Sequence, residues 1–287
     1  MLQQIIKFLW NNHRHNLWIM LELTVIAIVS WAVIDPLFVL NYNQSIPDGY
    51  EPDGLYRLEV TRNKMDTISD YERIMRGLRN YKDIESATCI VSGAYPSSPG
   101  NNMNEVFKDS VRVRMTYIPF FTHSGFFRTW RFRSAKDGSW ETLENMEVPK
   151  GSVILQEDAA MLLSGGADLT GQSVYSVYDS TEIPVVGVMQ PIKMRNSMQP
   201  YLVRMISLGD ESQMPEWAYN RSMRIFFRTR AGVPEGRFIE EFMPWVDENL
   251  SSGSLVFSKL SPFHQVQRDS DLREGVTNEI RMKYVLA

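Results

Sequence analysis

The feature that most constrains this chain is the apolar stretch Leu17–Leu40 near its N-terminus. As a helix, 24 residues span roughly 36 Å, which is enough to cross a bilayer. Glu22 and Asp35 lie towards the two ends of the stretch, where a carboxylate can reach headgroups or water at modest cost. We therefore predict a transmembrane helix over residues 17–40, with the lipid bilayer as its partner.

Three tryptophans are the candidate membrane-anchoring residues: Trp10, Trp18 and Trp31. Trp18 and Trp31 fall near the places where interfacial aromatic side chains belong, and Pro36 marks the expected end of the helix. Trp10 belongs to residues 1–16, where apolar side chains recur at helical spacing. This pattern is typical of an amphipathic helix lying on the membrane surface.

Charge predicts the orientation of the helix. Lys7 and Arg14 precede the apolar stretch, whereas Asp48, Glu51 and Asp53 follow it. By the positive-inside rule the N-terminus is cytoplasmic and the bulk of the chain is exported. A cleaved signal peptide, with Ser30–Ala32 as a small-x-small site, is the alternative to an uncleaved anchor.

Residues 41–54 are rich in Asn, Pro, Asp and Gly and are expected to form a linker. The remaining chain favours an α+β fold. A strand at 55–60, a helix at 69–83 and a strand at 87–91 are followed, about 160 residues later, by a similar strand–helix–strand series at 224–230, 234–250 and 255–260. Between the two series, residues 106–117, 151–156, 171–174 and 182–189 have strand patterns, and residues 157–164 read as a short helix. After the second series, residues 271–287 have a helical stripe.

No residue set indicates catalysis. The nucleotide-loop, nucleophile-elbow and zinc-helix motifs do not occur in the sequence. The single cysteine, Cys89, lies in an apolar strand and is expected to be buried and inert. His123 and His264 have no acidic or cysteine neighbour at ligand spacing. We therefore expect no enzyme activity, no metal and no cofactor in this chain.

Nucleic acid is not an expected partner either, because the net charge is −4. The segment 119–133 mixes aromatic residues with arginines, which can bind single strands. We predict instead that it packs in the core, with the arginines at its edge.

At Gly151–Val188 the sequence resembles a known family. GSVILQEDAAMLLSGGADLTGQSV followed by IPVVGVMQPIK is similar to the central pattern of MacB-type (MacB/FtsX-like) ABC transporter permeases. The Phe-Gly usual at the end of the helix is replaced by Leu163-Ser-Gly-Gly166. The resemblance implies a two-subdomain extracytoplasmic domain: a porter-like subdomain from residues 55–112 and 222–263, and an inserted strand-rich subdomain at 113–221. Residues 264–287 would form a stalk helix leading to a second transmembrane helix.

The resemblance further implies a location in the bacterial inner membrane, with the main domain periplasmic. It also implies an ABC ATPase partner that binds ATP outside this chain, and a homodimer or paired permease. Such a subunit couples ATP-driven motion to the exported domain, for export or for envelope regulation. The chain would then be either a fragment of a longer permease or a stand-alone descendant of one. The alternative is a single-pass anchored sensor or binding module without an ATPase. A membrane-anchored hydrolase is a third possibility, disfavoured because no nucleophile and base pair is visible.

Overall fold

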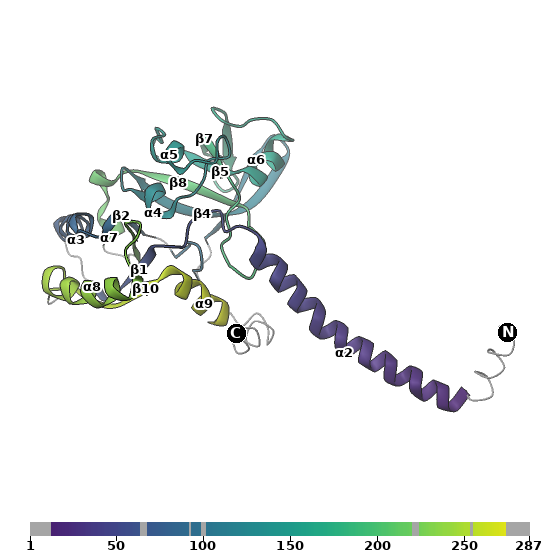
Figure 1. Ribbon diagram of the computed structural model, residues 1–287. Helices are drawn as coiled ribbons and strands as arrows, with labels where there is room; N and C mark the ends of the chain where they lie inside the picture. Colours follow the sequence, from purple (N-terminus) through teal and green to yellow (C-terminus); the bar gives the residue numbers. More distant parts are fainter. Residues whose placement is uncertain are drawn as a thin grey trace. The chain divides into compact units, whose positions relative to one another are not determined.

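The computed structural model describes residues 13–63, 68–91, 93–98, 102–219, 224–252 and 255–273. By its internal contacts the chain divides into two units, one containing residues up to Ser45 and the other Ile46–Glu274. Figure 1 shows a long N-terminal helix and a mixed helix and strand domain. The α+β class and the N-terminal apolar helix expected from the sequence are confirmed.

The N-terminal helix α2 spans His13–Ser45. It continues past Pro36, where the sequence indicated its end, and takes up the first part of the expected linker. A proline inside a helix removes one backbone hydrogen bond. Losing one bond does not end a helix of 33 residues whose following side chains, Leu37–Leu40, are again apolar.

A four-stranded antiparallel sheet has the order β10-β1-β9-β2. Its elements are β1 (Leu55–Asn63), α3 (Ile68–Asn80), β2 (Ile84–Ile90), β9 (Arg224–Thr229), α8 (Glu235–Asn249) and β10 (Leu255–Pro262). Two strand–helix–strand units interleaved in this order form the split βαβ arrangement of ferredoxin-like folds. The two similar series seen in the sequence therefore build one sheet.

The segment between β2 and β9 forms a closed barrel with the strand order β3-β4-β8-β5-β7-β6. The strands are β3 (Met103–Lys108), β4 (Val111–Thr122), β5 (Val153–Gln156), β6 (Ser173–Ser176), β7 (Glu182–Met189) and β8 (Val203–Asp210). Closure through the β3–β6 pair leaves the barrel without a free sheet edge.

Two expectations differ from this arrangement. Residues 106–117 are not one strand, because Asp109 has a left-handed backbone (φ 53°) and turns the chain from β3 into β4. The expected subdomain boundary after residue 112 would divide this hairpin, in which Val106 faces Val113. The change from sheet to barrel lies instead between β2 and β3.

Short helices complete the fold: α4 (Phe126–Trp130), α5 (Trp140–Glu144), α6 (Glu157–Ser164), the 3₁₀ turn η1 (Glu211–Gln213), α7 (Glu216–Tyr219) and α9 (Phe263–Arg273). The helical stripe expected from Asp271 lies largely outside the described residues. Asp271 itself lies near the end of α9, which starts at Phe263, and so does not begin a helix.

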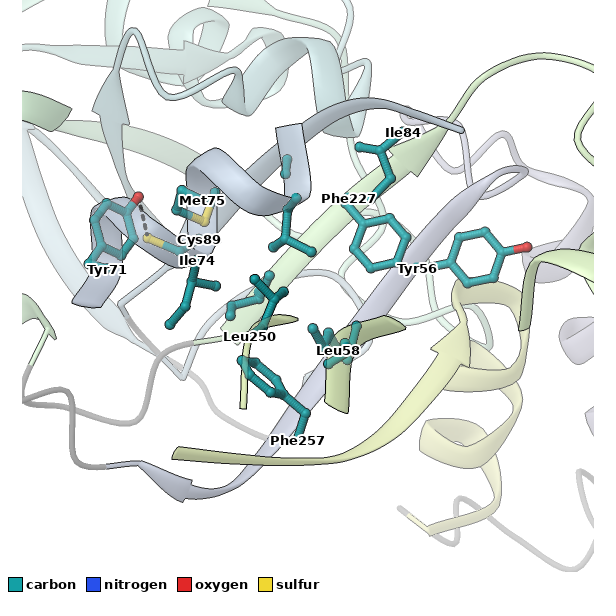
Figure 2. Close-up of a cluster of buried hydrophobic side chains, with 14 of the residues drawn as sticks. Tyr56, Leu58, Tyr71, Ile74, Met75, Ile84, Cys89, Phe227, Leu250 and Phe257 are labelled. Atoms are coloured by element: carbon teal, nitrogen blue, oxygen red, sulfur yellow. Dashed lines mark hydrogen bonds between the residues drawn. The ribbon is translucent and has the colours of Figure 1, made fainter. Parts of the chain in front are cut away.

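Apolar side chains form separate layers on the two faces of the sheet. On one face, residues of α3 and α8 pack against the strands, and Figure 2 shows part of this cluster, including Tyr56, Ile74, Cys89 and Phe227. A second cluster joins sheet residues such as Phe226 to barrel residues such as Ile118, and also takes in Phe263 of α9. Sheet, barrel and α9 therefore share one core.

The aromatic segment 119–133 packs in the core, as predicted, and most of its aromatic side chains belong to this second cluster, whereas Phe121 belongs to the first. Trp130 is fully buried and stacks on Phe132 with ring centroids 5.5 Å apart, while Arg128 stays exposed.

Candidate functional site

The first candidate site is the apolar part of α2, Leu17–Ser45, which is long and apolar enough to cross a membrane. From Leu17 to Ile34 its apolar side chains are exposed rather than packed in a core. Trp18 and Trp31 expose 59% and 71% of their surface, and lie roughly 20 Å apart along the helix. The predicted anchoring residue Trp10 lies outside the described residues.

The helix also satisfies a polar group within its apolar part. The Thr24 hydroxyl donates a hydrogen bond to the Met20 carbonyl oxygen at 2.7 Å. In hydrocarbon, where water is absent, an unbonded hydroxyl would be costly. Thr24 is thus compatible with a position inside a bilayer.

The second candidate site is a group of buried and half-buried polar residues that we call the junction: Asp48, Tyr50, Lys193 and Gln267. Lys193 is fully buried, and its ammonium lies 3.2 Å from a carboxylate oxygen of Asp48. The Gln267 side-chain amide donates to the other Asp48 oxygen at 2.9 Å and to the Tyr50 hydroxyl at 3.0 Å. Burial raises the pKa of Tyr50 well above its ordinary value, so its hydroxyl stays protonated.

The junction brings together distant parts of the sequence. Asp48 follows α2 directly, whereas Gln267 lies on α9, the last described helix, 219 residues later. Asn196 adds a bond from the same side, donating to Asp271 of α9 at 3.2 Å. The beginning and the end of the unit Ile46–Glu274 are therefore hydrogen-bonded to each other.

The end of the expected linker is also held in place. Arg228, on β9, donates to the backbone carbonyls of Glu51, Asp53 and Thr129. Burial lowers the pKa of Arg228 to about 10, yet it remains charged at neutral pH. Residues 46–54 are thus fixed to the domain rather than free to flex.

A third polar group lies where η1 meets α3. Glu211 accepts hydrogen bonds from Tyr71 and, at 2.8 Å, from Arg79. Beside it, His123 Nδ1 lies 2.6 Å from Asp210 Oδ2. The sequence shows no partner near His123, because Asp210 is 87 residues away. The two residues meet because β4 and β8 run parallel and end side by side.

Two clefts, of about 600 and about 470 Å³, share His123 and Asp210 as lining residues. The larger lies beside the loop that follows α5, and the smaller beside α3. Both clefts are open to solvent and their linings mix polar with apolar side chains, so they can accept a small ligand.

The geometry around His123 does not form a nucleophile–base pair. Asp210 bonds both His123 and the Ser212 hydroxyl, which places the acid between the serine and the histidine. In a catalytic triad the histidine must lie between the serine and the acid. Among the described residues no group of three His, Cys, Asp or Glu side chains could hold a metal ion.

Cys89 is buried, as predicted, and its thiol donates to the Tyr71 hydroxyl at 3.3 Å (Figure 2). Burial raises the pKa of Cys89 to about 12, which keeps it a thiol at neutral pH. Because the thiolate is the reactive form, burial disfavours Cys89 as a nucleophile in the folded chain.

Comparison with known proteins finds no matching family model and no matching curated relative. Among solved structures, the chain is similar to a domain of a permease protein from Porphyromonas gingivalis, at 14% identity and a TM-score of 0.49, covering 74% of this chain and 91% of that one. It is similar to the periplasmic region of MacB from Actinobacillus actinomycetemcomitans, at 11% identity and a TM-score of 0.46, covering 80% of this chain and 96% of that one.

A third similar structure is the extracellular domain of the noncanonic ABC-type transporter YknZ from Gram-positive bacteria. The identity is 9% and the TM-score 0.42, with 71% of this chain and 100% of that one covered. At these identities and scores we take no residue role or activity from the three structures. The chain is thus similar to extracytoplasmic domains of ABC permease-type proteins, the class that the sequence at Gly151–Val188 resembles.

Proposed function

We propose that this chain is a membrane-anchored, permease-type subunit of a MacB/FtsX-like ABC system. It would couple the ATP-driven motion of a partner ATPase to its exported domain, for export or for envelope regulation. The observation that carries this proposal is the junction, in which Asp48 is bonded to both Lys193 and Gln267. A displacement applied at either end of the exported domain reaches the other end through these bonds.

The packing of the domain supports the same conclusion. The core layer that joins sheet and barrel contains Phe226 of β9, Ile118 of β4 and Phe263 of α9. Closely packed interiors transmit displacement rather than absorbing it. Motion delivered at the junction would therefore move the domain as one body, which suits mechanical coupling.

In this proposal the ATPase is a separate partner, and the permease subunits pair, as two copies or with a related subunit. The chain lies in the bacterial inner membrane with its N-terminus in the cytoplasm. This orientation rests on Lys7 and Arg14 before the apolar stretch and on the acidic residues that follow it.

A second candidate function is an anchored binding module that works without an ATPase. The two clefts that share His123 and Asp210 favour it, because the volume of each suits a small ligand. A binding module would respond to its ligand and not to nucleotide.

One experiment separates the two functions. Tyr178 is 76% exposed, so Tyr178→Cys gives a spin-label site on the exported domain while Cys89 stays buried. Full-length chain in nanodiscs prepared from native membranes is then measured by pulsed electron resonance with and without Mg·ATP and vanadate. We expect the distance between labels on paired copies to change by several ångströms with nucleotide.

The control is Lys193→Met on the Tyr178→Cys background, which breaks the junction and should reduce the nucleotide-dependent change. If the distance between labels in the Tyr178→Cys chain with an intact junction does not change with nucleotide, mechanical coupling is refuted. The binding module would then be the better account of the fold.

A further inference from the structure

Arg204 is a buried arginine that none of the sites above uses. It lies on β8, is 1% exposed, and faces Tyr117 of β4 and Leu155 of β5 in the strand register. Neither its Nε nor its Nη1 atom has a hydrogen-bond acceptor among the described residues. The guanidinium carbon of Arg204 lies over the Tyr117 ring, 6.0 Å from the ring centroid, which is a cation–π contact.

Arg228 shows how the same fold buries an arginine that has partners. Its exposure is 2%, and burial lowers its pKa to about 10, as it does for Arg204. However, Arg228 donates to three backbone carbonyls, whereas the Nε and Nη1 atoms of Arg204 have no acceptor in the described part of the chain. The two residues therefore differ in their partners and not in their burial.

An unpaired buried charge is one of the most expensive features a fold can hold. A hydrocarbon side chain of similar size would fill the same space without this cost. At neutral pH Arg204 keeps its charge, because a pKa of about 10 lies well above 7. A buried polar group without a partner calls for a specific explanation, of which a bound ion is one.

Tyr117 is only partly buried, so contact with its ring places the guanidinium one side chain from solvent. Rotation of that ring would expose planar N–H donors, whose geometry matches the oxygens of a carboxylate or a phosphate. We propose that Arg204, gated by Tyr117, binds a small oxyanion, either a phosphate or a carboxylate. This inference does not depend on the proposed transport function.

The test measures thermal unfolding of the full-length chain in non-ionic detergent by circular dichroism at pH 7.4. Inorganic phosphate, sn-glycerol 3-phosphate or acetate is added at an ionic strength held constant with sodium chloride. Inorganic phosphate represents a free anion, glycerol phosphate a lipid headgroup, and acetate a carboxylate. For at least one probe we expect a saturable rise in unfolding temperature of about 2–8 °C.

Arg204→Met should abolish this rise, and should raise the unfolding temperature in chloride alone because an unpaired charge is gone. If the methionine variant fails to fold, Arg204→Lys and Arg228→Lys serve instead as a matched pair of variants. The first should weaken the response to the anion and the second should leave it intact.

An equal rise in the wild type and the Arg204 variants would overturn the proposal. The proposal would also be overturned if none of the three probes raised the unfolding temperature. Arg204 would then be hydrated and would not bind an anion.

Discussion

Breaking the charge pair at the junction is the sharpest test of the structure. Lys193→Met keeps the length of the side chain and removes its ammonium, which is fully buried 3.2 Å from Asp48. Removing one partner of a buried pair costs about 3–5 kcal/mol when the remaining charge is fully desolvated. The Asp48 side chain is 17% exposed and keeps its bond from Gln267, so we expect a cost below this range, about 2–3 kcal/mol.

Asp48→Asn should cost more, about 3–5 kcal/mol, because it removes the carboxylate that lies 3.2 Å from the fully buried ammonium of Lys193. The double variant should be destabilised by at least about 1 kcal/mol less than the sum of the single variants, since both charges are then absent. Urea unfolding of the full-length chain in detergent, followed by near-ultraviolet circular dichroism, gives the free energies of unfolding. Single-variant effects that add to within about 0.5 kcal/mol would refute the junction as a coupled pair.

Four further predictions concern other parts of the chain. Cysteine placed at Tyr178, which is 76% exposed, should react with a membrane-impermeant thiol reagent in intact cells without their outer membrane; labelling only after lysis would contradict the proposed orientation. Cys89, with its pKa raised by burial to about 12, should stay unreactive to a thiol reagent at pH 8 until the chain unfolds; reaction at the rate of a free thiol would show that the strand is exposed. Hydrogen bonds, chiefly from Ser212, lower the pKa of Asp210, so its contribution to stability should be present above its unfolded pKa and decline as the pH falls towards the folded pKa; Asp210→Asn should lessen the loss of unfolding temperature over that range, and an unchanged pH profile would refute this assignment. Gly49→Ala should lower stability by about 2 kcal/mol or more, since Gly49 has φ +77° and an added Cβ would lie 2.1 Å from a backbone oxygen; a thermal melt matching the wild type would contradict the position of the segment after α2.

Much of the secondary structure could be predicted from local patterns. Helix α3 carries Tyr71, Ile74, Met75 and Leu78 at helical spacing, and these are its buried residues. Their burial follows from periodicity alone, because one face of a helix must meet the core. The same reasoning anticipated the buried thiol of Cys89 on β2.

Strand β8 shows where local patterns are insufficient. Val203, Arg204 and Met205 alternate between apolar and polar, but Ile206 follows Met205 directly and interrupts the alternation that would mark a strand. The strand exists because β4 and β5 supply hydrogen bonds on both of its sides. Pairing partners distant in the sequence, rather than local preference, decide such a strand.

By itself, the sequence determined the anchor helix, the α+β class and the two strand–helix–strand series, because each depends on the order of apolar residues over a short stretch. Only the tertiary structure decided that Asp48 meets Lys193 and Gln267, and that His123 meets Asp210. These contacts depend on which strands pair and where the chain returns. The paired residues are 87 and 219 positions apart, so no short stretch of sequence indicates that they meet. The proposed function rests on these contacts.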